Sequence, residues 1–108
     1  MKPNPHNIFQ KVSSMYDTSY KIWVVAGSAG GDETENSQIL SDIVDVFQNG
    51  GYYVGIISEL GTWYDYYGDF TKLKDLDLIY KPIDDMTLSY RDFVPFGGWN
   101  KPTMKMLT

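Results

Sequence analysis

The chain has 108 residues, a hydrophobic content of 43%, a net charge of −5 and no cysteine. This hydrophobic content predicts a folded chain with one modest core rather than a disordered chain. The acidic balance argues against nucleic acid and anionic membranes as partners, because no basic stripe could neutralise phosphates. The missing cysteines exclude disulfides, thiolate zinc sites and a cysteine nucleophile. No apolar run approaches the roughly 20 residues that a membrane-spanning helix needs.

The first elements expected in chain order are an arm and a short helix. Residues 1–7 include two prolines, so we expect them to be extended or irregular. Ile8, Val12 and Met15 are spaced like one face of a helix.

Residues 21–58 predict a strand, a helix and a second strand. Residues 21–26 and 52–58 are short apolar runs, typical of strands that are buried on both faces. Between them, residues 36–48 carry an apolar stripe at helical spacing, with Asp32 or Thr34 as the cap. Two such strands joined by a helix predict a parallel βαβ crossover. Ligands of parallel sheets bind beyond the carboxyl ends of the strands, so we expect any chemistry there.

The glycine loop at residues 27–31 is a weak candidate for a phosphate site. It lacks the G-x-G-x-x-G spacing and the G-K-[ST] motif, and acidic residues follow it at once. We therefore interpret these acids as partners of the helix dipole.

The rest of the chain predicts smaller elements. We expect a short helix at residues 62–67 that Gly68 ends, a strand at residues 76–80, a loop at residues 83–95 and a last strand at residues 103–107. No linker or repeat interrupts the sequence, so residues 1–108 are expected to form a single domain.

Residues 96–105 carry the most specific motif of the chain and read Phe-Gly-Gly-Trp-Asn-Lys-Pro-Thr-Met-Lys. This segment resembles the GGW-x-K-P-x-x-K signature near the C-terminus of glycoside hydrolase family 25, the Chalaropsis-type lysozymes, in the branch found in nematodes and amoebae. Other segments are similar to the family in order and spacing: residues 21–23, 54–58, 63–68, 78–84 and 89–93.

The resemblance implies an α/β fold that is incomplete. Family 25 enzymes are (β/α) barrels of nearly twice this length, and their first strands would lie before Met1. We therefore expect a partial (β/α) barrel with a parallel βαβ core. Four or five strands cannot close a cylinder, which predicts either a strongly curved open sheet or a homodimer that covers the exposed edge.

Both acids of the family's catalytic strand are replaced here. The family has an L-D-[IV]-E-G motif after the tryptophan that Trp23 resembles, and its two carboxylates correspond to Val25 and Gly27. Glycoside hydrolysis needs an acid for the leaving oxygen and usually a second carboxylate beside the sugar carbon. Loss of one catalytic acid typically costs about 10²–10⁴-fold in rate, so loss of the cluster predicts an inactive relative.

Three other acids are the remaining catalytic candidates. Glu59 follows the strand at residues 52–58, and Asp84 and Asp85 follow the next strand, so they could face one cleft. Either aspartate resembles the acid of the family's L-W-Y-A-x-Y-D strand. The alternative is that all three are ordinary loop carboxylates of an acidic chain.

Aromatic residues near the expected strand ends are candidates for sugar binding. Trp63, Tyr64, Tyr80 and Trp99 could stack on sugar rings, or Trp63 and Trp99 could close one end of the core.

No metal or other cofactor is expected. The single histidine, His6, has no neighbouring ligand, and the acids do not follow the EF-hand spacing. We also expect Lys101 and Lys105 to be solvated.

Three functions are consistent with these patterns. The first is a degenerate lysozyme-like protein, similar to an N-acetylmuramidase, without catalytic activity but with weak affinity for peptidoglycan or another amino-sugar polymer. The second is an active lysozyme that uses the remaining acids, and the third is a small α/β protein-interaction module. The location is not predicted: residues 1–7 lack the apolar segment of a secretory signal, whereas family 25 relatives are usually secreted or lysosomal.

Overall fold

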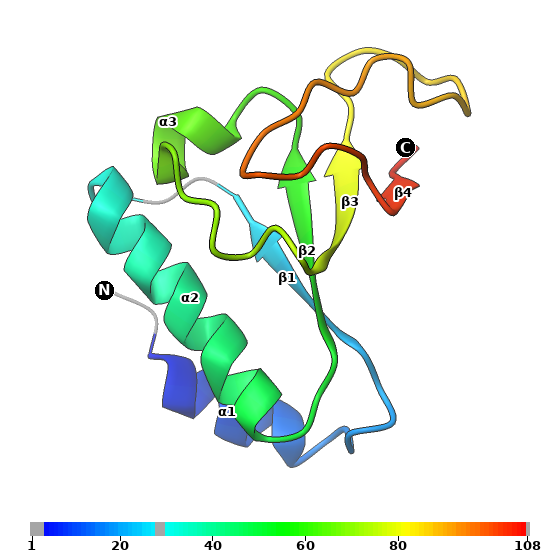
Figure 1. The fold of residues 1–108 in the computed structure, drawn as a ribbon. Coiled ribbons are helices and arrows are strands. Elements are labelled where there is room, and N and C mark those ends of the chain that lie inside the picture. Colours follow the sequence, from blue (N-terminus) through cyan, green and yellow to red (C-terminus); the bar gives the residue numbers. More distant parts are fainter. Residues whose placement is uncertain (1–3, 28–29, 108) are drawn as a thin grey trace.

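A four-stranded parallel sheet lies at the centre of the structure, a computed structural model that describes residues 4–27 and 30–107 (Figure 1). Its strands are β1 (Ile22–Ala26), β2 (Val54–Glu59), β3 (Asp77–Lys81) and β4 (Met104–Lys105), and they neighbour one another in sequence order. The helices are α1 (Pro5–Ser13), α2 (Glu33–Asn49) and α3 (Trp63–Tyr67). The parallel βαβ core is confirmed. The sheet is open, with β1 and β4 as its edges, and the homodimer stays a prediction.

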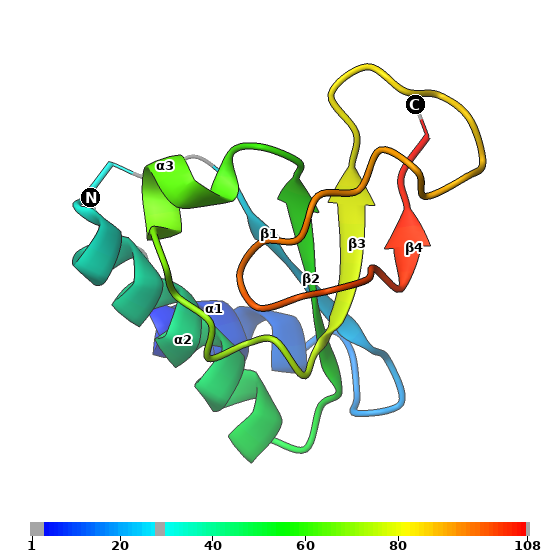
Figure 2. The same cartoon turned by 45° about the horizontal axis from the view of Figure 1, so that its top comes forward.

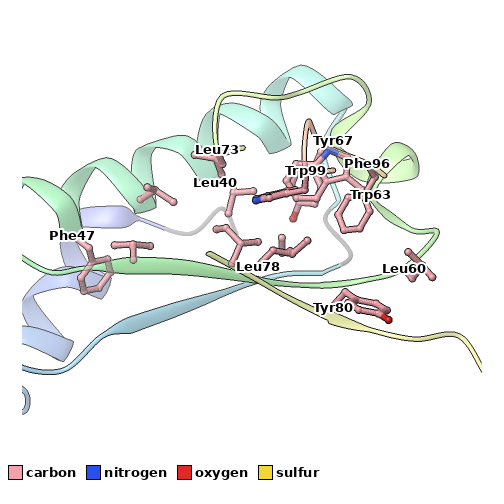
Figure 3. Packing of buried hydrophobic residues seen from close by; sticks show 14 of the residues in the cluster. Leu40, Phe47, Leu60, Trp63, Tyr67, Leu73, Leu78, Tyr80, Phe96 and Trp99 are labelled. Carbon is pink, nitrogen blue, oxygen red and sulfur yellow. The ribbon is translucent and has the colours of Figure 1, made fainter. Parts of the chain in front are cut away.

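The core lies between α2 and one face of the sheet. The stripe of α2 buries Leu40, Val44 and Phe47 against Ile56 of β2 and Leu78 of β3, and all five are less than 5% exposed. Figure 3 shows Leu40 and Leu78 in the space between the helix and the strands. Helix α1 packs on α2, on the side away from most of the loops after β3 (Figures 1 and 2).

The other face of the sheet is not covered by a helix of the described chain, and we call it the open face. It carries a row of apolar side chains, one from each strand: Val25, Ile57, Ile79 and Met104. Val25 is 69% exposed, so the expectation that β1 is buried on both faces is wrong. The physical reason is position, because β1 is an edge strand and alternate side chains of a strand point to opposite faces.

Helix α1 begins earlier than the sequence suggested. Pro5 is its first residue, so the extended arm is wrong for residues 5–7, and residues 1–3 lie outside the described residues. Proline suits this position because the N–H that it lacks would have no helical partner. The side chain of Asn4 caps the helix and accepts hydrogen bonds from the backbone N–H groups of His6 (3.0 Å) and Asn7 (3.3 Å).

Helix α2 also begins before the expected start, at Glu33. Of the two expected caps, Asp32 is confirmed, because its Oδ1 accepts from the backbone N–H of Glu35 at 2.7 Å. The expected end of α3 is confirmed at Gly68, whose positive φ of 59° suits glycine.

Candidate functional site

The carboxyl ends of β1 and β2 border a hollow of about 380 Å³. This is where the parallel topology leads us to expect a site. Val25 and Gly27, the positions that correspond to the family's lost acids, both line it. Among the described residues of its wall, Glu59 is the one acid.

Glu59 has a cation as its close neighbour. Its register partner in β3 is Lys81, whose Nζ lies 3.7 Å from the Glu59 carboxylate, and the two side chains are 57% and 46% exposed. A catalytic carboxylic acid that must hold its proton near neutral pH needs burial or a neighbouring carboxylate. Glu59 is instead more than half exposed, and the charged group recorded beside its carboxylate is a cation.

Asp84 and Asp85 line a different hollow of about 460 Å³, between the start of α3 and the loop after β3. Its wall does not include Glu59. The three acids, which the sequence suggested could share one cleft, therefore line separate hollows: Glu59 lines the first, and Asp84 and Asp85 line the second.

Asp85 and Asp92 are held by a buried lysine. Lys105 is 3% exposed in its side chain, and its Nζ lies 3.2 Å from Asp85 and 3.1 Å from Asp92. The expectation that Lys105 is solvated is therefore wrong. The hydroxyl group of Tyr80 donates a hydrogen bond to Asp92 Oδ1 at 2.6 Å. The sequence contains one signal for this lysine, since it is the last residue of the GGW-x-K-P-x-x-K signature.

These contacts shift the pKa values of the groups involved. Hydrogen bonds from Thr87, first from its backbone N–H, lower the pKa of Asp85 to about 2. The hydrogen bond from Tyr80, followed by that from Lys105, lowers the pKa of Asp92. Burial, and then the Asp92 carboxylate, raises the pKa of Tyr80. Asp85 and Asp92 are thus ionised anchors for the loop after β3.

Three of the four aromatic candidates are buried inside the protein. Trp63, Tyr80 and Trp99 are 1%, 0% and 4% exposed, and Trp63 meets Trp99 edge-on at 5.3 Å between ring centroids (Figure 3). The indole N–H of Trp99 donates to the Leu76 carbonyl at 2.9 Å. These positions match the alternative in which the two tryptophans close one end of the core. Tyr64 is different, because it is 56% exposed.

No group of three potential metal ligands gathers among residues 4–27 and 30–107, and no helix there is long and apolar enough to cross a membrane. Residues 28 and 29 of the glycine loop lie outside the part that the structure describes.

Comparisons with known proteins give a lysozyme-like family model and several relatives. A family model described as "Lysozyme-like protein 1" matches residues 6–107. Counting factor 45-1 of Dictyostelium discoideum is 37% identical over 76 residues, which cover 69% of this chain and 25% of that protein. Counting factor 50 is 34% identical over the same shares of the two chains, 69% and 25%. Probable GH family 25 lysozyme 4 is 27% identical over 95 residues, 85% of this chain and 44% of that protein.

The chain thus spans between a quarter and less than half of the length of these curated relatives, all from Dictyostelium discoideum. No solved structure gives a significant match.

Proposed function

The chain belongs to the lysozyme-like family related to glycoside hydrolase family 25, and we propose that it is a member without glycosidase activity that retains weak affinity for amino-sugar polymers such as peptidoglycan. In this proposal the open sheet is a part of a (β/α) barrel, and the whole chain is one domain. The inference of a barrel rests on the family, because the sheet itself is open.

One observation carries the loss of activity. In the hollow at the strand ends, the two positions where the resemblance requires carboxylates are occupied by Val25, which is apolar, and Gly27, which has no side chain. Its remaining acid, Glu59, is exposed and lies beside Lys81. An acid and a second carboxylate, normally about 5–9.5 Å apart, are needed on the two sides of a glycosidic bond. The described wall of this hollow contains a single carboxylate, that of Glu59.

A cell-wall lysis assay tests the absence of activity. We expect no release of reducing sugar from bacterial peptidoglycan, with the wild type equal to Glu59→Gln and Asp84→Asn. A family 25 lysozyme is the positive control. Turnover that disappears in either variant would contradict the proposal and favour an active lysozyme that uses the remaining acids.

Sedimentation with insoluble peptidoglycan or chitin tests the retained affinity separately. We expect partial co-sedimentation that soluble chitooligosaccharide reduces. If the protein stays in the supernatant with both polymers, the sugar-binding half of the proposal is wrong even when lysis is absent.

A protein-interaction module is the second candidate, and the open face favours it. The apolar row on that face includes Val25 at 69% exposure and Met104 at 44% exposure. Exposed apolar patches often mark contacts with other proteins. A tight protein partner, combined with no binding to either sugar polymer, would favour this candidate over the first.

A further inference from the structure

The hollow between α3 and the loop after β3 has the properties of a small-molecule pocket. Its volume of about 460 Å³ falls in the range of roughly 300–1,000 Å³ that is usual for such sites. Its buried apolar lining consists of Leu60, Trp63 and Phe96. Its more exposed apolar lining consists of Tyr64, Ile83 and Val94.

The walls of this hollow are fixed by the core and by the buried lysine. Trp63 packs against Phe96 at 5.8 Å between ring centroids. The ion pairs from Lys105 to Asp85 and Asp92 also tie the loop after β3 to β4. A pocket that is formed before the ligand arrives loses little free energy to ordering on binding.

The charge of the rim indicates which ligand the hollow favours. Three carboxylates line it. Asp85 and Asp92 share the ammonium group of Lys105, and Asp85 also lies 3.7 Å from Arg91 Nε. The side chain of Asp84 is exposed and has no hydrogen bond or ion pair within the described chain. A lone carboxylate beside an apolar surface attracts a cation whose body is apolar.

We propose that this hollow binds a small organic cation with an apolar body and a single ammonium group. The body lies against Tyr64, Ile83 and Phe96, and the ammonium group pairs with Asp84. The site is distinct from the hollow at the ends of β1 and β2 and does not depend on the proposed sugar affinity.

Titration of the ¹⁵N-labelled protein with 2-phenylethylamine, followed by NMR, tests the inference. We expect saturable shifts of backbone signals confined to residues 60–64, 83–85 and 94–96. The isosteric anion 3-phenylpropionate should cause no saturable shift at the same concentrations. Asp84→Asn should weaken amine binding about two- to fivefold, the range expected for an exposed ion pair. Asp75→Asn, an exposed aspartate before β3 instead of after it, should leave the affinity unchanged.

A second variant blocks the hollow itself. Val94 is 65% exposed, so Val94→Arg should fold and should place a cation over the site that competes with the amine. Loss of amine shifts in this variant, with an otherwise native spectrum, would support the inference. The inference is overturned if the amine and the carboxylate shift the same signals equally, if the shifts lie elsewhere, or if Asp84→Asn and Asp75→Asn bind alike.

Discussion

Lys105 organises the loop after β3 through several contacts of one side chain. Its Nζ donates to the carbonyl of Ser89 at 3.0 Å and pairs with Asp92 at 3.1 Å and Asp85 at 3.2 Å. It also lies over the ring of Tyr80, 5.9 Å from the centroid. A charge with 3% exposure needs such partners, because an unpaired buried ammonium group is costly.

Replacement of this lysine should therefore destabilise the protein. In Lys105→Met, two carboxylates lose their shared cation and a buried donor disappears. We expect the free energy of unfolding, measured with urea, to fall by about 1–3 kcal/mol. Lys101→Met is the matched control, since Lys101 is exposed and should change little. Equal effects of the two variants would show that the network does not stabilise the loop.

The depressed pKa of Asp85 predicts a pH dependence of stability. A carboxyl group whose pKa falls to about 2 on folding, from about 4 in the unfolded chain, contributes stability above pH 4. That contribution is lost as the pH falls from about 4 to about 2, because the unfolded chain then binds the proton first. Asp85→Asn should flatten the profile of unfolding free energy in this window. Asp17, Asp77 and Asp92 also have lowered pKa values, so some slope should remain. An unchanged slope in Asp85→Asn would contradict the assignment.

At the scale of elements, the helix caps show how local sequence sets boundaries. Asp32 bonds the backbone N–H of Glu35, whereas Thr34, the other candidate cap, lies inside the helix as its second residue. The acids of the first turn, Glu33 and Glu35, also favour this end of the helix dipole. The start of α2 is therefore set by one side-chain hydrogen bond, the one that Asp32 accepts from Glu35.

The capping assignment predicts a difference between two neighbouring substitutions. Asp32→Ala should reduce the free energy of unfolding by about 0.5–2 kcal/mol, the usual contribution of a cap. Thr34→Ala should be neutral or slightly stabilising, because alanine has the higher helix propensity. Urea denaturation of both variants measures this. The reverse order of the two effects would place the cap at Thr34.

The βαβ core was predictable from the sequence, whereas the surroundings of Lys105 and Val25 were not. Helical spacing of apolar residues is a local property, and the stripe with Leu40, Val44 and Phe47 gave the right helix and the right buried face. The burial of Lys105 depends on the path of the loop at residues 82–103, which no local pattern encodes. The exposure of Val25 depends on what covers the sheet, which is equally non-local.

At the scale of the molecule, the sheet has one face packed on helices and one open face (Figures 1 and 2). Parallel sheets are normally covered on both faces. On the open face, Trp23 lies so close over Gly55 that a Cβ there would be 2.4 Å from its ring, and Lys21 lies 4.4 Å above the same ring. Side chains of this face thus partly cover one another near the start of the strands. At the carboxyl ends of the strands the open face is less covered by side chains, since Val25 is 69% exposed.

This asymmetry predicts that β1 tolerates charge on one face and rejects it on the other. The double variant Val25→Asp, Gly27→Glu introduces the acids that the family resemblance requires. Val25 is 69% exposed, and the nearest atom to a Cβ at Gly27 would be Val25 Cγ1 at 3.9 Å, so both side chains have room. The free energy of unfolding should fall by about 1 kcal/mol or less, because aspartate suits a strand less well than valine and the new acids lie near Glu59. Ala26→Asp, on the same strand but 2% exposed, should cost about 3–5 kcal/mol as an uncompensated buried charge. If the double variant is as unstable as Ala26→Asp, a second surface must cover the open face in solution, and light scattering would identify a homodimer as that cover.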